Sequence, residues 1–447
     1  MKRVYIKTYG CQMNERDSEL VAHDLIKNGY ELVPKESEAD VVLLNTCSVR
    51  EQAEQKAIGK ANNLLSKSRK TKEVKLGILG CMAQNRGSNL NNDLNGVDLI
   101  VGTQKFHRVS EYLDEISKNP KYSNQNPLID LNDEEGSQNT INQHLSTNLN
   151  QVSAFVSIMQ GCNMNCSFCI VPKTRGKERY RDMDEICNEI IGLRERGVRE
   201  VTLLGQIVNA YGRGVFPRID GKSPFVQLLG KIHLIDGIER IRFTSPHPTS
   251  FGPDLIEAFG NLPKLGDYTH LPMQSGSDKI LKSMNRPYTR ERFLKLVSAL
   301  RTVNSNMRIS TDVIVGYPGE NEEEFEETIS AFKEAAFEMA FIFKYSERSG
   351  TPACQFPDKI PQEIKEKRNQ ILLKILEEQS KASNERLKNR TMNVLVETNA
   401  RKGRGDLMGR TNCYRKVIFS AGRELIGKIV PVRIDQATST VLKGSLV

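Results

Sequence analysis

Three cysteines near the middle of the chain stand close enough together to share one metal group. Cys162, Cys166 and Cys169 fall within eight residues, separated by three and then two residues. Thiolates with this spacing can bind three irons of a four-iron cube and leave the fourth iron open to another ligand. A structural zinc ion needs four ligands, but the next cysteine, Cys187, lies in an expected helix and no histidine is near. The spacing therefore favours an iron–sulfur cluster, with a zinc site as the alternative.

Three further cysteines each follow a short apolar run that is typical of a strand. They are Cys11, Cys47 and Cys81, and the runs before them span residues 4–8, 40–45 and 74–79. The carboxyl ends of parallel strands meet at one edge of a sheet, so the thiols can converge although 36 and 34 residues separate them. A lone cysteine after a strand is usually a small buried hydrophobe. Three in equivalent positions indicate a second site with three ligands and an open iron.

Polar residues and glycines at the carboxyl ends of later strands are candidates for binding a small ligand. On the strand expected at residues 308–315, alternation places Asp312 and Ser310 on one side. A buried carboxylate there needs a partner, which a ligand hydroxyl or ammonium group would supply. A hydrogen bond to a neighbouring strand is the structural alternative. The candidate positions are Gly205, Gln206, Ser245, Gln274 and Asp312.

The elements that must position these residues alternate between strand-like and helix-like stretches. Expected helices at 17–28 and 50–66 separate the first strands, which predicts an amino-terminal doubly wound parallel sheet. From residue 154 about six strand–helix units follow, which favours a partial barrel. The expected barrel strands span residues 154–159, 200–204, 240–244, 268–271, 308–315 and 339–345, and the expected helices span residues 183–196, 226–235, 290–303 and 322–335.

The last part of the chain carries most of the net positive charge. Residues 391–447 hold ten Lys or Arg and four Asp or Glu, which is +6 of the chain's +9. Short Val- and Ile-rich runs predict a small antiparallel barrel after a charged helix at 362–387. Basic side chains bind phosphates, and Tyr414 and Phe419 can stack on bases, so we expect an RNA-binding domain, with a solvated basic surface as the alternative. The expected RNA contacts are Arg401, Lys402, Arg404, Arg415 and Lys416, joined by Arg175 just past the central cysteines.

Composition excludes several classes of protein. Hydrophobic residues make up 38% of the 447 residues, which is enough for packed cores. Nine cysteines are too few for a disulfide scaffold. No apolar run approaches the ~18 residues of a membrane-spanning helix, and the first residues lack the features of a secretory signal. We therefore expect a cytoplasmic protein without a membrane anchor.

The two cysteine sets together with their flanking residues resemble the methylthiotransferase family of radical S-adenosylmethionine enzymes, and the resemblance covers nearly the whole chain. Within the family, the motifs are most similar to the branch that acts on isopentenylated adenosine in bacterial tRNA. One departure is Ile207, where the family usually has Asn. The matching motifs are TYGCQMN at 8–14, NTCSVR at 45–50, VPKTRGKER at 171–179, HLPMQSGS at 270–277 and YSERSGTP at 345–352.

The resemblance implies four regions: an amino-terminal domain at 1–117, a polar linker at 118–150, a TIM-like (β/α)6 radical core at 151–380 and an OB-like TRAM domain at 381–447. It implies two 4Fe-4S clusters and S-adenosylmethionine as cofactors. The central triplet would then serve radical generation, and the amino-terminal triplet would carry the sulfur. The strand-end candidates would bind S-adenosylmethionine.

The implied reaction adds a methylthio group to C2 of N6-isopentenyladenosine next to the anticodon. The implied partners are the anticodon loop of tRNA and an electron donor such as a flavodoxin or ferredoxin, and we expect a monomer. Two alternatives remain at this point. The substrate can be threonylcarbamoyladenosine in tRNA or a ribosomal protein, or the chain can be a non-enzymatic zinc-containing RNA-binding protein.

Overall fold

The computed structural model describes residues 2–48, 51–68, 74–87, 89–94, 96–123, 125–133, 151–400 and 405–447. The chain forms two compact units. The first comprises residues 1–149, 159–164 and 169–185. The second comprises residues 150–158, 165–168 and 186–447.

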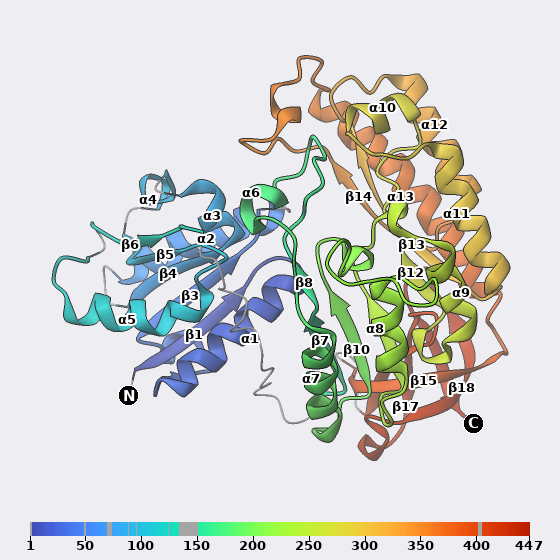
Figure 1. Ribbon diagram of the computed structural model, residues 1–447, viewed down its shortest axis with the longest axis horizontal. Coiled ribbons are helices and arrows are strands. Elements are labelled where there is room, and N and C mark those ends of the chain that lie inside the picture. Colours follow the sequence, from blue (N-terminus) through green and yellow to red (C-terminus); the bar gives the residue numbers. More distant parts are fainter. Residues whose placement is uncertain are drawn as a thin grey trace. The chain divides into compact units, whose positions relative to one another are not determined.

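The first unit contains a six-stranded sheet in the order β2-β1-β3-β4-β5-β6, and all five neighbouring pairs are parallel. Helices cover both faces of this sheet (Figure 1), which confirms the predicted doubly wound fold. The strands are β1 (Arg3–Thr8), β2 (Glu31–Leu32), β3 (Val41–Thr46), β4 (Lys75–Gly80), β5 (Leu99–Val101) and β6 (Leu128–Asp130). The helices are α1 (Gln12–Lys27), α2 (Glu51–Ser68), α3 (Cys81–Arg86), α4 (Asn89–Asp93) and α5 (Val109–Lys118).

Strand β3 shows why the sheet forms. All of its residues are buried, and alternate side chains enter different cores. Leu43 packs with residues of α1 and α5, whereas Leu44 packs with residues of α2, α3 and α4. A strand that is apolar on both faces requires helices on both sides, which is the usual arrangement of a parallel sheet. Edge strand β6 lies within the stretch predicted to be a polar linker, so the sheet extends further than expected; residues 134–150 lie outside the described residues.

The second unit contains six parallel strands in two three-stranded sheets, β7-β10-β11 and β12-β13-β14. Strands β11 and β12 lie beside one another without a hydrogen-bond ladder, so the six strands form the predicted partial barrel. The strands are β7 (Ser153–Ser157), β10 (Glu200–Leu204), β11 (Arg240–Phe243), β12 (Tyr268–His270), β13 (Arg308–Val315) and β14 (Met339–Lys344). The α-helices that follow residue 182 are α7 (Met183–Glu195), α8 (Pro224–His233), α9 (Pro253–Asn261), α10 (Asp278–Ser283), α11 (Arg290–Val303), α12 (Glu322–Glu334) and α13 (Gln362–Glu385).

The chain ends in a closed five-stranded barrel in the order β15-β16-β17-β19-β18. The prediction of an antiparallel barrel holds for four of its neighbouring pairs, but β17 and β19 run parallel. The closure needs β16, which the sequence pattern missed. The strands are β15 (Thr391–Asn399), β16 (Asp406–Thr411), β17 (Lys416–Ser420), β18 (Ile429–Ala437) and β19 (Leu442–Leu446).

The turn between β16 and β17 closes the amino-terminal end of the larger barrel. Arg242 at β11 donates to the carbonyl oxygens of Thr411 and Asn412 at 3.1 and 3.3 Å. The Tyr414 ring stacks on Tyr268 with centroids 4.7 Å apart. Charged and aromatic side chains at this end are thus used for packing, and the carboxyl ends of the strands remain for ligands.

Candidate functional site

The ends of three adjacent strands bring together Cys11, Cys47 and Cys81. In the sheet, Thr8 of β1 pairs with Asn45 of β3, and Thr46 of β3 pairs with Gly80 of β4, so the three strands end at the same level. Cys11 is the N-cap of α1 and Cys81 is the first residue of α3. The thiols of Cys11 and Cys47 are within hydrogen-bond reach, and the Cys11 thiol also acts electrostatically on Cys81.

Two glycines let the backbone approach these cysteines closely. Gly10 has φ +140°, and a Cβ there would lie 2.6 Å from Cβ of Cys47. Gly80 has φ +96°, and a Cβ there would lie 2.7 Å from the carbonyl oxygen of Thr46. Any larger residue would push the strand ends apart. The convergence of the thiols therefore depends on glycine at both positions.

Two buried asparagines join α1 to the end of β3. The Asn14 amide donates to Oδ1 of Asn45 at 3.1 Å and to the carbonyl oxygen of Thr46 at 3.0 Å. Nδ2 of Asn45 donates to the carbonyl oxygen of Asn14 at 2.9 Å, and the Cys11 thiol donates to Oδ1 of Asn14 at 3.2 Å. These bonds fix the first turn of α1, and with it Cys11, against the neighbouring strand.

The electrostatic surroundings of the three thiols differ. The pKa of Cys11 falls to about 6 because its thiolate accepts a hydrogen bond from Cys47 and lies near the positive charge of Arg175, although burial acts in the opposite direction. Burial raises the pKa of Cys81, and Arg175 opposes that rise. Thiolates are the form that binds metal. Cys11 thus ionises more readily than Cys81.

This donor set fits a cluster better than a single ion. No three His, Cys, Asp or Glu side chains among the described residues lie close enough to bind one metal ion. A four-iron cube spreads its thiolates more widely, because each binds a different iron. Three sulfur donors without a fourth ligand also leave zinc incompletely coordinated. Cys11, Cys47 and Cys81 therefore suit an iron–sulfur cluster with one open iron.

The central cysteine loop is held by local hydrogen bonds. In the first unit, the backbone N–H of Cys162 donates to the carbonyl oxygen of Gly176 at 3.0 Å. In the second unit, Sγ of Cys166 accepts a hydrogen bond from Nη1 of Arg286 at 3.3 Å. Next to it, Ser167 donates through its backbone N–H to the carbonyl oxygen of Met284 at 3.1 Å. The thiolate of Cys166 thus has a positively charged donor beside it, which stabilises negative charge on sulfur.

Gly205, Gln206, Ser245 and Gln274 follow the carboxyl ends of β10, β11 and β12, whereas Asp312 lies within β13. Ser245 and Gln274 have φ of +58° and +68°, a conformation that non-glycine residues adopt mostly where function or packing requires it. Oδ2 of Asp312 lies 3.2 Å from Nε2 of His270, so the carboxylate has a partner on the neighbouring strand. Gly205 is buried and Gln206 is half-buried. For Asp312, this geometry favours the structural alternative.

His247, after β11, was missed by the sequence reasoning. Its Nδ1 accepts a hydrogen bond from the backbone N–H of Thr249 at 3.3 Å, so a neutral ring carries its proton on Nε2. Burial, with the charges of Arg286 and Arg213, lowers the pKa of His247 to about 3, so the ring is neutral near pH 7. The residue is 5% exposed, and Nε2 has no hydrogen-bond partner among the described residues. A buried, unused N–H donor at a strand end can bind an oxygen or nitrogen of a ligand.

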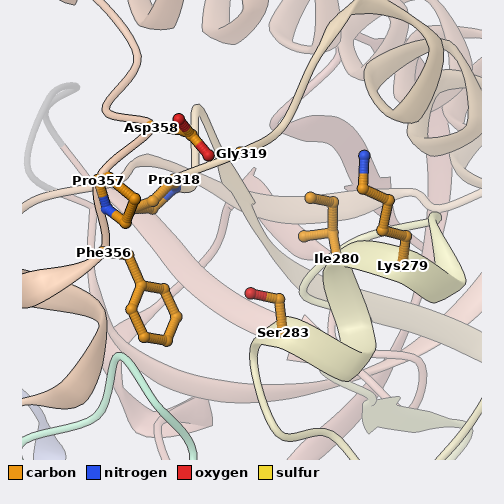
Figure 2. Close-up of a pocket in the computed structure, with 8 residues that line it drawn as sticks. All are labelled: Lys279, Ile280, Ser283, Pro318, Gly319, Phe356, Pro357 and Asp358. Atoms are coloured by element: carbon orange, nitrogen blue, oxygen red, sulfur yellow. The ribbon is translucent and has the colours of Figure 1, made fainter.

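A cavity of about 240 Å³ lies beside the turn that follows β13 (Figure 2). One of its lining residues, Ser283, accepts a hydrogen bond from Ser167 through its carbonyl oxygen at 2.8 Å. The ammonium group of Lys279 pairs with Glu324 at 2.6 Å. The cavity therefore lies behind the loop that carries Cys166 and shares none of the strand-end candidates. Its lining residues are Lys279, Ile280, Ser283, Pro318, Gly319, Phe356, Pro357 and Asp358.

The expected RNA contacts fall into three groups. Lys416 is exposed on β17, in keeping with a phosphate contact, and Arg401, Lys402 and Arg404 lie outside the described residues. Arg415 is 7% exposed and binds Asn384 at 2.7 Å and Glu338 at 2.5 Å. A phosphate contact does not fit this side chain.

Three more side chains expected to meet RNA are engaged within the protein. Arg175 is 3% exposed and pairs with Asp17 at 2.6 Å, so a phosphate contact does not fit it. Tyr414 packs on Tyr268, and Phe419 lies in the core of the small barrel. Neither aromatic ring offers a free face to a base, so stacking by Tyr414 or Phe419 does not fit the structure.

Three family models match consecutive parts of the chain. Residues 3–102 match the model described as Uncharacterized protein family UPF0004. Residues 156–332 match the Radical SAM superfamily, and residues 385–447 match the TRAM domain. Among the described residues, no helix combines the length and the apolar composition needed to cross a bilayer.

Curated relatives match over nearly their full length. A tRNA-2-methylthio-N(6)-dimethylallyladenosine synthase from Opitutus terrae is 53% identical, covering 100% of this chain and 98% of the relative. Proteins of the same name from Methylacidiphilum infernorum and Akkermansia muciniphila are 49% and 47% identical, covering 95% and 98% of those relatives and 100% and 99% of this chain. Among solved structures, the radical S-adenosylmethionine methyltransferase TsrM from Kitasatospora setae matches with a TM-score of 0.58. At 12% identity over 79% of this chain and 75% of that chain, this match shows the fold alone.

Proposed function

The chain belongs to the family of tRNA-2-methylthio-N(6)-dimethylallyladenosine synthases, and we propose that its six patterned cysteines hold the two four-iron clusters of this reaction. The enzyme adds a methylthio group to C2 of N6-isopentenyladenosine in tRNA. The assignment rests on the sheet register: strands β1, β3 and β4 end at the same level, and a cysteine follows each of them. Cys162, Cys166 and Cys169 form the second set, assigned from their spacing.

The target C–H bond carries no acidic proton, so a general base has no role at it. When bound, the central cluster and S-adenosylmethionine supply the radical that attacks this bond, and the auxiliary cluster supplies the sulfur. Cys162, Cys166 and Cys169 hold the group for radical generation. Cys11, Cys47 and Cys81 hold the sulfur-bearing group. The protein's remaining tasks are to orient the ligands and to exclude water.

Residues at the carboxyl ends of the barrel strands bind and orient S-adenosylmethionine in this proposal. Support comes from their position and from the positive φ of Ser245 and Gln274. His247 adds an uncharged Nε2–H donor for a ligand oxygen or nitrogen. The full set is Gly205, Gln206, Ser245, Gln274, Asp312 and His247.

The carboxyl-terminal barrel binds the RNA backbone in this proposal. Lys416, together with Arg401, Lys402 and Arg404, supplies positive charge for phosphates. The anticodon loop presents the target base unpaired, which lowers the free energy needed to move it into a pocket. We further propose a monomer in the cytoplasm that receives electrons from a flavodoxin or a ferredoxin.

Iron and sulfide quantification after anaerobic reconstitution tests the assignment. Full-length protein should bind about eight irons, and about four should remain when either cysteine triplet is changed to alanine. A colourless protein with stoichiometric zinc, or retention of all iron after loss of one triplet, would contradict it.

Nucleoside analysis of tRNA from a deletion strain tests the substrate, because the 2-methylthio-isopentenyl nucleoside should disappear. If the deletion strain instead lost a threonylcarbamoyladenosine derivative or a ribosomal-protein modification, the substrate assignment would be wrong.

A further inference from the structure

A buried ion pair lies beside the amino-terminal cysteines. Arg175 ends the short helix α6 (Val171–Arg175), which begins two residues after Cys169. Its Nη2 lies 2.6 Å from Oδ2 of Asp17 on α1, and their side chains are 4% and 1% exposed. Both residues belong to the first unit, where α6 packs against α3, the helix that begins at Cys81. The same segment thus joins the third central cysteine to a cation in the interior of the amino-terminal domain.

The position of this cation is fixed by its neighbours. The hydroxyl of Thr103 donates to the carbonyl oxygen of Thr174 at 2.5 Å. Arg179 donates through Nη2 to the carbonyl oxygen of Arg175 at 3.3 Å and through Nη1 to Oε1 of Gln104 at 3.1 Å. These bonds hold both ends of the peptide around Arg175, so the guanidinium cannot easily leave its place.

The ion pair is incompletely satisfied by its own partners. Nη1 of Arg175 and Oδ1 of Asp17 have no hydrogen-bond partner of good geometry among the described residues. Burying such a pair is expensive, and apolar packing of similar volume is often equally stable. The guanidinium also lies near the neighbouring thiols, because it is within hydrogen-bond reach of Cys81 and its charge acts on Cys11. A purely structural pair explains neither the unused donor nor its place beside two thiols.

We propose that Arg175 is a positioning residue of the auxiliary site, a fixed positive charge that stabilises anionic sulfur bound there. The inference rests on the proposed function, since it takes Cys11, Cys47 and Cys81 as cluster ligands. Three thiolates and an added hydrosulfide concentrate negative charge in a buried volume, where attraction to a nearby cation is strong. The same charge favours the reduced state of the cluster and raises its reduction potential. Asp17 holds Arg175 in place, and its negative charge acts on Cys81 in the direction opposite to that of Arg175.

The experiment uses full-length protein in which Cys162, Cys166 and Cys169 are alanine, so that only the auxiliary cluster remains. The main variant combines Asp17→Asn with Arg175→Gln, because two uncharged amides remove the ion pair without leaving an unpaired buried charge. Comparison variants are Asp17→Asn alone, which keeps the cation without its counter-ion, and Arg175→Lys, which keeps the charge. The matched control is Lys173→Gln, which removes an exposed cation from the same helix. Readouts are iron content, an anaerobic redox titration followed by electron paramagnetic resonance, and a spectroscopic titration with hydrosulfide.

The double variant should keep about four irons and bind hydrosulfide about tenfold more weakly. Its one-electron equilibrium should shift about tenfold toward the oxidised form, which is about 59 mV. Asp17→Asn should shift the potential in the opposite direction, whereas Arg175→Lys and Lys173→Gln should keep the potential of the starting protein that lacks the three central cysteines. If the double variant kept the reduction potential and the hydrosulfide affinity of the starting protein, Arg175 would have only a structural role and the inference would be wrong. If the starting protein, which lacks the three central cysteines, bound no iron, the cluster assignment itself would be wrong. The two failures are therefore distinguishable.

Discussion

Cys162, Cys166 and Cys169 lie within one eight-residue segment, whereas Cys11, Cys47 and Cys81 come from the ends of three strands and span 71 residues. The central set is brought together by the chain itself. The amino-terminal set depends on sheet register, on two glycines and on buried asparagines. A cluster site can thus be encoded locally or by the fold. The second kind should be the more sensitive to changes outside its ligands.

The largest expected effect separates the chemical roles of the two sets. Cys166→Ala should abolish reductive cleavage of S-adenosylmethionine, because it removes a ligand of the radical-generating cluster. Cys47→Ala should spare that cleavage and abolish sulfur insertion. Quantifying 5′-deoxyadenosine and methylthiolated nucleoside in parallel measures both. Cys354→Ala, outside both patterns, is the control, and equal loss of both activities in the two variants would contradict the division of roles.

The dependence of the amino-terminal set on the backbone can be tested at Gly10. Gly10→Ala places a Cβ 2.6 Å from Cβ of Cys47 at φ +140°, which should cost about 1–3 kcal/mol from backbone strain alone and displace the strand ends further. We expect loss of about half of the bound iron, with the central cluster retained. Gly29→Ala is a matched control, because Gly29 also has positive φ but no atom lies within 4 Å of its Cβ position. Equal iron loss in the control would show that strain, and not the contact with Cys47, is responsible.

The same contrast explains which features could be predicted from the sequence. The convergence of the amino-terminal cysteines followed from strand periodicity, since parallel strands end at one edge, and six βα units predicted the partial barrel. β6 and β16 were missed because a three-residue edge strand has little periodicity and Gly409 interrupts the apolar pattern of β16. The Arg175–Asp17 pair joins residues 158 positions apart, and no local sequence pattern predicts such a contact. Burial of Arg415 likewise depends on Glu338 and Asn384, which are remote in sequence.

A smaller effect is expected where α1 meets β3. Asn14→Ala removes the hydrogen bonds to Asn45, Thr46 and Cys11, which together contribute about 3 kcal/mol at ~1 kcal/mol each. The variant should lower the free energy of unfolding by about that amount and release auxiliary iron faster under a chelator. Asn28→Ala changes an exposed amide just beyond the other end of α1 and serves as the control. Unchanged iron release from the Asn14 variant would show that the asparagine network serves stability alone.

The smallest effect is expected at the central set, where Sγ of Cys166 accepts a hydrogen bond from Arg286. Arg286→Gln removes the charged donor 3.3 Å from Sγ of Cys166, and hydrogen bonds to charged groups contribute about 1.5–3 kcal/mol. Because the three central ligands are neighbours in sequence, we expect the variant to bind its full iron and to show a lowered central-cluster potential. A redox titration of protein with Cys11, Cys47 and Cys81 changed to alanine isolates that cluster. Arg290→Gln is the control, since Arg290 pairs with Ser330 and Glu334 on the surface. If Arg286→Gln instead lost its iron as readily as Gly10→Ala, the central set would depend on the fold as strongly as the amino-terminal one, and the contrast between them would fail.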